Sequence, residues 1–120
     1  MIKLKIEVAD TPSSLAHGLM YRTHLASDEG MLFKFPYSQQ AGFWGQNTYI
    51  PLDVAFIDNG KVLDIQSITP MSTRIIRSAS MCSMAVETNA GFFSQHRIKP
   101  GASVNVDLEN REITFNVENN

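Results

Sequence analysis

A hairpin signal in the middle of the chain constrains the fold more than any other feature. Two apolar stretches, residues 51–57 and 61–68, flank the tripeptide Asp58-Asn59-Gly60. Asn-Gly is typical of a two-residue turn between antiparallel strands, because both residues accept positive φ angles. We therefore predict a pair of antiparallel strands here, to which the rest of the fold has to be joined.

Apolar and polar residues alternate with a period of two near both ends of the chain. The alternation covers residues 2–8, and it returns at residues 104–108 and 113–117 on either side of Glu109-Asn110. This pattern is typical of strands with one buried face and one face in water. It predicts an N-terminal strand and a C-terminal hairpin.

Three shorter apolar stretches predict further strands, at residues 31–35, 41–44 and 81–88. Pro36 interrupts the first of them, which favours an edge position or a strand end, because proline cannot donate a hydrogen bond to a strand ladder. Residues 69–80 are rich in Ser, Thr and Met, and they follow neither the strand nor the helix period.

Two short helices are also expected. Thr11 can cap a helix that begins at Pro12, where the missing N–H of proline has no consequence. The residue three positions after the cap is Ser14 rather than an acid, so we expect an incomplete capping box. A second helix is expected within residues 90–97, ended by Pro100-Gly101.

These elements add up to a β-rich α+β fold. Seven or eight mainly antiparallel strands, with two short helices, favour a small barrel or a compact sandwich. A length of 120 residues is typical of one domain, which we expect to span residues 1–120.

Charge and cysteine content limit the partners and cofactors. The formal net charge is −2, and nucleic-acid binding draws most of its affinity from basic side chains on phosphates, so we expect no nucleic-acid partner. The histidines (His17, His24 and His96) have no metal-ligand spacing among themselves or with Cys82, and we expect no metal and no cofactor. The lone Cys82 also excludes an intramolecular disulfide.

The sequence predicts a soluble, cytoplasmic protein. No apolar run approaches the ~20 residues that cross a bilayer, so no membrane span is expected. The alternation already present in residues 2–8 does not resemble a signal peptide. If a signal peptide has been removed ahead of Met1, we expect an exported protein instead. The oligomeric state is left open.

Several segments, taken in order, carry a resemblance to a known family. They are Gly18-Leu19-Met20-Tyr21-Arg22, Phe43-Trp44-Gly45-Gln46-Asn47-Thr48, Ile50-Pro51-Leu52-Asp53 and Val86-Glu87. With them the chain resembles the family known as domain of unknown function 192 (DUF 192). The resemblance implies a small domain dominated by β-strands and implies no reaction. Gly45 and Gln46 stand where that family commonly carries methionine and lysine, and Ala102 stands where an aspartate is frequent.

Asp53 is the most informative carboxylate in the sequence. On a strand over residues 51–57, Leu52, Val54 and Phe56 share one face, and Asp53 falls on the other. An acid among apolar neighbours is either hydrogen-bonded into the structure or held for proton transfer. Both interpretations stay open.

Trp44 and Asn47 lie in a turn just before that strand. The ring of Trp44 can offer its face to a ligand, and the amide of Asn47 can orient the ligand through its donors and its acceptor. The structural alternative is that Trp44 fills the core while Asn47 stabilises its own turn.

Arg22 and Glu87 complete the set of candidate ligand-binding residues. Arg22 can bind an anionic substrate or form an ion pair with Asp53 or Glu87, and an ion pair that fixes the first helix is the commoner role. Glu87 is expected to share a strand face with Ala85. If Asp53 and Glu87 converged, they would form the paired carboxylates of a hydrolase.

Three functional hypotheses follow, and no catalytic residue is assigned. The first is a module that binds a small polar ligand or a protein partner in a cleft near Trp44, Asn47 and Asp53. The alternative is a hydrolase-like enzyme with Asp53 and Glu87 as acid and base. The third is a protein–protein interaction module with an adaptable surface formed by Met20, Met31, Met71, Met81 and Met84.

Overall fold

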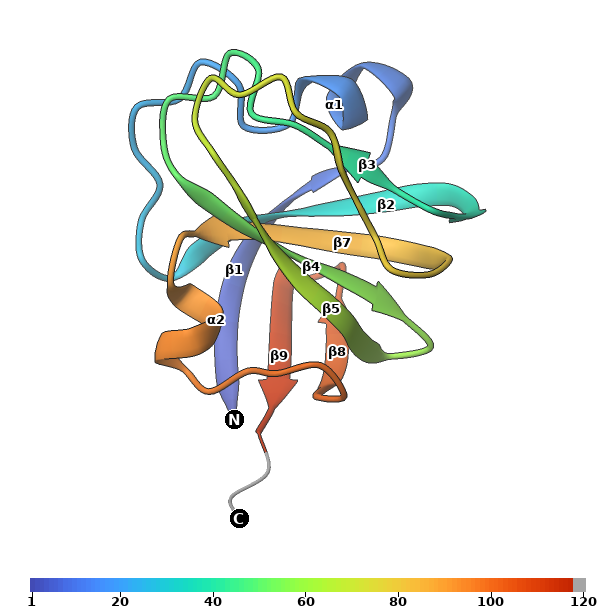
Figure 1. Cartoon of the computed structure of the whole chain (residues 1–120). Helices are drawn as coiled ribbons and strands as arrows, with labels where there is room; N and C mark the ends of the chain where they lie inside the picture. The colour runs from blue at the N-terminus through green and yellow to red at the C-terminus, as the bar shows by residue number, and fades with distance from the viewer. Residues whose placement is uncertain (118–120) are drawn as a thin grey trace.

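The structure is a computed structural model, and it describes residues 1–117. These residues form nine strands and two short helices (Figure 1). In chain order they are β1 (Ile2–Ala9), α1 (Pro12–His17), β2 (Glu29–Gln39), β3 (Gly42–Phe43), β4 (Leu52–Asp58), β5 (Lys61–Ile68), β6 (Ile76–Arg77), β7 (Cys82–Asn89), α2 (Phe92–Gln95), β8 (Ser103–Asp107) and β9 (Glu112–Asn116). Over residues 1–117 no helix is long and apolar enough to cross a membrane.

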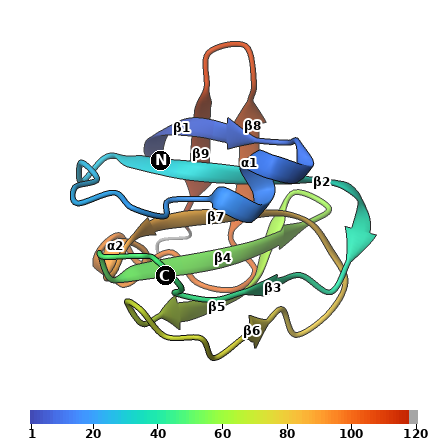
Figure 2. The ribbon, with the colours of Figure 1, turned by 90° about the horizontal axis from the view of Figure 1, so that it is seen from above.

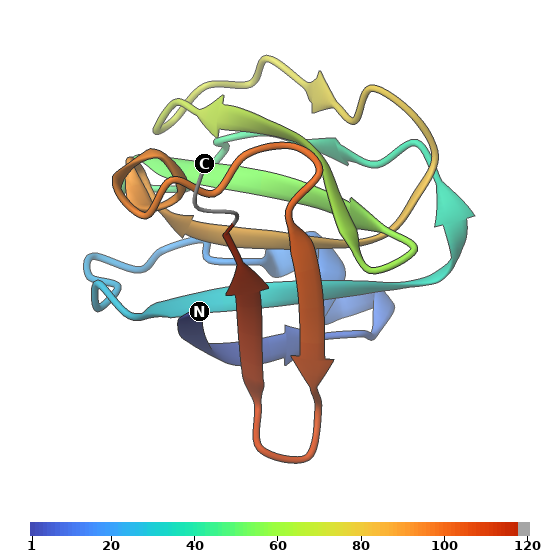
Figure 3. The ribbon, with the colours of Figure 1, turned by 90° about the horizontal axis from the view of Figure 1, so that it is seen from below.

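Seven of the strands close into a barrel in the order β1-β2-β7-β4-β5-β8-β9, with β9 paired back onto β1. Every pair is antiparallel except β1 with β2, which run parallel. In the view from below, the β8–β9 hairpin runs across the blue strand β1 and the cyan strand β2 (Figure 3). A separate two-stranded sheet joins β3 to β6. The predicted β-rich α+β fold, with mainly antiparallel strands rolled into a barrel, is confirmed.

The central hairpin forms where the sequence predicts it. Strands β4 and β5 meet at Asn59 and Gly60, whose φ angles are 50° and 70°. Positive φ at both turn residues matches the right-handed twist of the strands on either side. The two-residue turn therefore sets the pairing next to it, Ile57 with Val62 and Asp58 with Lys61, and an irregularity between Phe56 and Ile57 shifts the register of the remaining pairs.

Strand β2 continues through Pro36, so of the two alternatives predicted for this proline, an edge position or a strand end, the strand end does not occur. Pairing with β7 is regular as far as Lys34 and resumes only at Gln39, after a shift of register. Pro36 therefore lies in the interrupted part of the ladder, where a missing N–H leaves no partner unsatisfied. The extra length of β2 carries the chain across to β3.

The capping box of α1 is complete, which corrects the second local prediction. The Thr11 hydroxyl accepts a hydrogen bond from the Ser14 backbone N–H at 3.1 Å, and the Ser14 hydroxyl accepts one from the Thr11 N–H at 3.0 Å. A serine side chain thus replaces the acid of the usual box. These local bonds matter because α1 buries none of its six residues.

Strands β2, β7 and β4 have a hydrophobic core on each of their faces. One face packs against β1, β9 and α2 through residues such as Leu32, Val86 and Phe93. The other face carries Phe33 and Ala85, and belongs to a second core that lies towards α1 and β3. Figures 1 and 2 show α1 and α2 on opposite sides of β7. Alternate residues of one strand therefore serve two different cores.

The stretch that the sequence left undefined, residues 69–80, holds β3 over the second core. It contains β6, which pairs Ile76 with Phe43. Next to that pair, Ser78 and Ala41 exchange two hydrogen bonds, one through the Ser78 hydroxyl at 3.1 Å and one through its N–H at 2.9 Å. At the other end of β3, Gly45 donates its N–H to the Ser72 carbonyl at 2.8 Å.

Gly45 is required by this close approach, and a substitution there tests the arrangement. A Cβ added at Gly45 would lie 1.9 Å from the Thr69 carbonyl oxygen, so the backbone would have to move. At Gly42 the nearest atom would be the flexible end of Arg77, at 3.1 Å. We expect Gly45→Ala to lower the free energy of unfolding by about 2–3 kcal/mol and Gly42→Ala by less than about 1 kcal/mol. Urea denaturation measures both, and equal losses would contradict this account of the loop.

Candidate functional site

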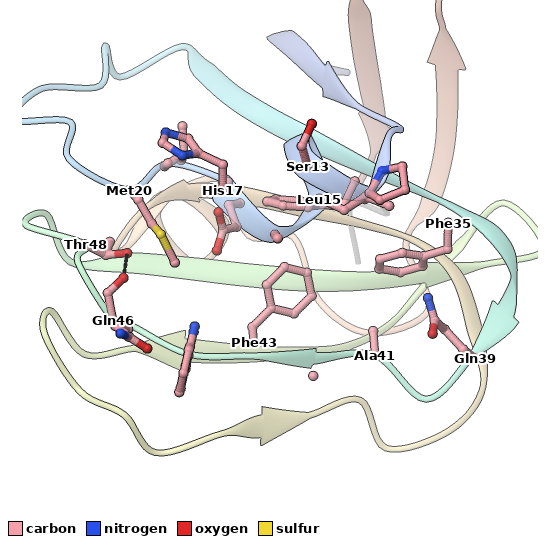
Figure 4. A pocket seen from close by; sticks show the side chains of 18 of the residues that line it. Ser13, Leu15, His17, Met20, Phe35, Gln39, Ala41, Phe43, Gln46 and Thr48 are labelled. Atoms are coloured by element: carbon pink, nitrogen blue, oxygen red, sulfur yellow. Dashed lines mark hydrogen bonds between the residues drawn. The ribbon is translucent and has the colours of Figure 1, made fainter.

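A cleft of about 990 Å³ opens between α1 and β3, above the second core. Its walls come from four parts of the chain: α1 and the turn after it, β2, β3 and the loop that follows β3. In Figure 4, Phe43 reaches from β3 into the middle of the cleft, with Met20 on one side and Phe35 on the other. Most of the side chains around this space are apolar or aromatic.

The ring of Phe43 is held firmly by two other aromatic rings. Its centroid lies 4.9 Å from that of Phe33, with an interplanar angle of 85°. The Phe56 ring lies 5.7 Å away from it on the core side. Edge-to-face pairs of this kind add to the stabilisation from burial. The aromatic wall of the cleft is therefore anchored in the second core.

Polar groups are few along the walls. The Thr48 hydroxyl donates to the Gln46 carbonyl at 3.2 Å, a bond drawn in Figure 4. His17 borders the cleft from α1 and is exposed to solvent. Over residues 1–117, no group of three or more His, Cys, Asp or Glu side chains is placed to hold a metal ion.

Glu87 lies on the floor of the cleft. It sits on β7 directly between Met31 of β2 and Val54 of β4, both buried members of the second core. Only 5% of Glu87 is exposed. No hydrogen bond among the described residues reaches its carboxyl group, and the carboxyl oxygens are not fully enclosed, because Glu87 borders the cleft. An acid is thus placed where the fold otherwise has apolar side chains.

Burial alone raises the pKa of Glu87 to about 8. Removing a carboxylate from water disfavours its charged form, and no neighbouring positive charge compensates for this. At neutral pH Glu87 is therefore mostly a neutral carboxylic acid, which can donate one hydrogen bond and accept others.

Gly18 leaves the space beside the Glu87 carboxyl open. This residue follows α1 with a φ of 52°, in a region that favours glycine. A Cβ placed there would lie 3.3 Å from the tip of the Phe33 ring and 3.7 Å from Glu87 Oε1. The end of α1, the Phe33 ring and the acid therefore border the same small space.

Of the five residues that the sequence suggested as ligand-binding candidates, Trp44 and Glu87 border the cleft. Trp44 is 41% exposed, so it is a wall residue and not a core residue. Asn47 lies just outside the cleft with a φ of 56°, and its carbonyl accepts a hydrogen bond from the Tyr21 N–H at 2.7 Å. Asn47 thus connects the loop before β4 to the segment that follows α1.

Asp53 lies on the face of the sheet opposite Glu87, where hydrogen bonds hold its side chain in the fold. Its carboxylate accepts a hydrogen bond from the Ser67 hydroxyl at 2.9 Å and another from the Gly91 N–H at 2.8 Å. Gly91 precedes α2, so this carboxylate joins β4 and β5 to the start of that helix.

Arg22 pairs with Glu7 of β1, not with Asp53 or Glu87. The two side chains form a bidentate ion pair, with Arg22 Nη2 2.8 Å from Glu7 Oε1. The hydrogen bond from Arg22 lowers the pKa of Glu7. The pair is on the surface and fixes the segment after α1 against the barrel, which is the structural role that the sequence suggested.

Asp53 and Glu87 do not converge. On the paired strands, Asp53 lies opposite Thr88, while Glu87 lies opposite Val54. Because paired residues point to the same side of a sheet, the two carboxylates project from opposite faces. The paired-carboxylate geometry on which the hydrolase hypothesis depends is absent.

The methionines do not form one common surface. Met31 is buried, Met20 borders the cleft, and Met84 packs against the first core. Met71 and Met81 are exposed, each at 55%. The adaptable apolar surface of the interaction hypothesis is therefore not assembled from these five residues.

Sequence reasoning placed Glu87 and Ala85 on one face, and the strand pairing agrees. It missed the aromatic walls formed by Phe33, Phe35 and Phe43, and it missed Gly18. No local signal indicates these residues, because the cleft depends on α1 and β3 lying over the same face of the sheet.

Removing the acid from the cleft floor tests its burial. With a pKa of about 8 in the native state and near 4.5 when unfolded, Glu87 holds a proton in the fold that it releases on unfolding. Its contribution to stability is therefore complete below about pH 4.5 and is lost as the pH rises towards 8, on the order of 1 kcal/mol per pH unit. We expect Glu87→Gln to remove this decline. Urea unfolding of both proteins from pH 5 to pH 8 measures it, and parallel curves would contradict the pKa shift.

A second pair of variants tests the structural role of Asp53. Asp53→Ala loses both hydrogen bonds and leaves the Gly91 N–H without an acceptor, so we expect a loss of about 1–3 kcal/mol. Asp53→Asn keeps an acceptor for Gly91 and an amide group for Ser67, and we expect a loss below about 1 kcal/mol. Thermal unfolding at pH 7 compares them. If Asp53→Ala and Asp53→Asn lower the stability equally, the negative charge of Asp53 stabilises the fold and its two hydrogen bonds do not.

Comparison with known proteins places the chain among relatives of similar fold. A family model described as DUF192, Uncharacterized ACR, matches residues 2–106. A protein from Sinorhizobium meliloti 1021, provisionally named a transcription regulator, is 39% identical with a TM-score of 0.80, over 82% of this chain and 78% of that chain. A protein of unknown function from Novosphingobium aromaticivorans DSM 12444 is 35% identical with a TM-score of 0.79, over 82% and 71%. No curated protein sequence matches significantly.

Proposed function

The chain belongs to the DUF192 family, domain of unknown function 192, and we propose that it binds a small, largely apolar molecule in the cleft between α1 and β3. One observation carries this proposal: Glu87 is buried on the cleft floor without a hydrogen-bond partner among the described residues. A buried polar group without a partner is unfavourable for the fold. A ligand that bonds to the acid would supply the missing interaction.

The size and lining of the cleft support a small molecule as the occupant. A volume of about 990 Å³ lies at the upper end of the roughly 300–1,000 Å³ typical of ligand sites. Such sites combine a mainly apolar wall with a few polar groups that orient the ligand. Here the rings of Phe33 and Phe43 supply apolar contact, and Glu87 supplies the directional group.

The walls differ in how firmly they are held. The floor belongs to β2 and β7, which have a core on each side. The opposite wall, α1, has no fully buried residue, and it is held by its capping box, by partly buried Leu15 against the second core, and by the surface pair of Arg22 with Glu7. Exposed ion pairs of this kind contribute little stability. A ligand would therefore meet a rigid floor and a wall that can adjust.

This proposal refines the sequence-based hypothesis of a binding module. Trp44 and Glu87 are retained as candidate ligand contacts, Asn47 and Arg22 hold the segment after α1 from outside the cleft, and Asp53 lies on the opposite face of the sheet with no part in the site. A domain that senses a small molecule would also suit a regulatory protein, the class provisionally given to the Sinorhizobium meliloti relative. The signal would then be the occupant of the cleft.

Truncating the central ring of the cleft tests the proposed function. A library of small aromatic fragments is screened against ¹⁵N-labelled protein, and we expect hits to shift the backbone amides of β3 and of residues 85–89. Phe43→Ala should weaken these hits by roughly tenfold, since truncating a buried aromatic contact typically costs more than 1 kcal/mol. Leu108→Ala is the control, because Leu108 is an exposed apolar residue beyond the end of β8. Fragments that bind only at other surfaces would contradict the proposal.

A further inference from the structure

We propose that the ligand of the cleft carries an ammonium group on an apolar body, with Glu87 as its counterion on the cleft floor. This inference rests on the proposed ligand-binding function and adds the chemical class of the ligand. The proposed contact has two parts, an ion pair with the Glu87 carboxylate and apolar contact of the ligand body with the aromatic side chains that line the cleft.

The charges around the cleft favour a cation. Among the described residues that border it there is no Lys, Arg or Asp, and Glu87 is the one acid. His17 is the one basic side chain, and it is exposed on α1. An anionic ligand would therefore meet no fixed positive charge, and it would keep Glu87 in its neutral form. An ammonium group would instead favour the carboxylate form of Glu87, for which the lining of the cleft supplies no other fixed counterion.

The space next to the acid is small and aromatic. Gly18 has no side chain on the side that faces Glu87, where a Cβ would lie 3.7 Å from Glu87 Oε1 and 3.3 Å from the tip of the Phe33 ring. Because Glu87 borders the cleft, the ammonium group of a ligand bound there can approach the carboxyl group past this glycine. The Phe33 ring supplies apolar contact for the body of the ligand. Phe43, 4.9 Å from Phe33 between centroids, extends the same aromatic surface towards the opening.

An ammonium group also satisfies Glu87 more completely than a neutral ligand. A carbonyl group can accept the single proton of the neutral acid and leaves the second oxygen without a donor. An ammonium group brings up to three donors, and charge-assisted hydrogen bonds are about twice as strong as neutral ones. On binding below pH 8, Glu87 releases its proton to solvent and the ligand keeps its own, so the bound pair is carboxylate and ammonium.

Proton release gives the inference a direct signature. The empty cleft holds a proton on Glu87 up to about pH 8. An ammonium ligand must displace that proton, so its affinity should rise by roughly ninefold from pH 6 to pH 7. A ligand that accepts a hydrogen bond from the neutral acid should show constant affinity over this range and weaker binding above pH 8. The two classes therefore differ in the sign of their pH dependence.

The experiment uses three probes of nearly equal shape: benzylammonium, benzyl alcohol and benzoate. Each is titrated into the ¹⁵N-labelled chain from pH 6 to pH 8, and the shifts of the amides at residues 85–89 report cleft binding. We expect benzylammonium to bind more tightly than the other two and to show the rise with pH. Glu87→Gln should weaken it by at least about 30-fold. Asp53→Asn removes an equal charge outside the cleft and should leave its affinity unchanged.

The outcomes separate this inference from the proposed function. If benzyl alcohol or benzoate binds the cleft and benzylammonium does not, the ammonium assignment is overturned and ligand binding stands. If none of the three probes shifts the cleft amides, both proposals are overturned. Equal affinity of benzylammonium for the parent and for Glu87→Gln, or no change between pH 6 and pH 7, removes Glu87 as the counterion. The pH dependence of benzylammonium binding is measured on the parent protein, so it tests the inference even if Glu87→Gln does not fold.

Discussion

Burial of β7 on both faces is the constraint on which the rest of the structure depends. This strand lies between β2 and β4, with one hydrophobic core below it and a second above it. Its side chains therefore alternate between two dry environments, with Val86 in one core and Ala85 in the other. Because neither face is wet, the position of each element above or below β7 is determined by which apolar residues it can cover.

Glu87 is the exception to this pattern, and its surroundings explain its properties. It occupies a position between Met31 and Val54 that an apolar side chain would fill with a gain in stability. The fold instead leaves the acid next to an open cleft, with Gly18 providing the space above it. Groups held against stability are concentrated at functional sites, where the protein retains them for binding or chemistry. The contrast with Asp53 is informative, since that acid on the adjacent strand has two hydrogen-bond donors and no cleft.

The parts of the fold that the sequence predicted are those with local causes. Asn59-Gly60 produces the central turn by itself, and strand alternation gives the face of Glu87 correctly. The two local corrections have local causes as well, since Pro36 lies in an interrupted ladder instead of ending its strand, and the Ser14 hydroxyl replaces an acid. The cleft has no such signal. It requires that α1, from the start of the chain, and β3, held by residues 69–80, cover the same face of β7.

The same separation between local and long-range causes accounts for the unequal walls of the cleft. The floor is fixed by strand pairing and by two cores, so its acid and its aromatic rings have defined positions. The α1 wall has no fully buried residue, and it is held by partly buried Leu15, which packs against the second core, by a capping box within four residues and by one exposed ion pair. Local unfolding begins where few apolar contacts are made. The floor is therefore the more firmly held part of the cleft, and the position of α1 depends on fewer buried contacts.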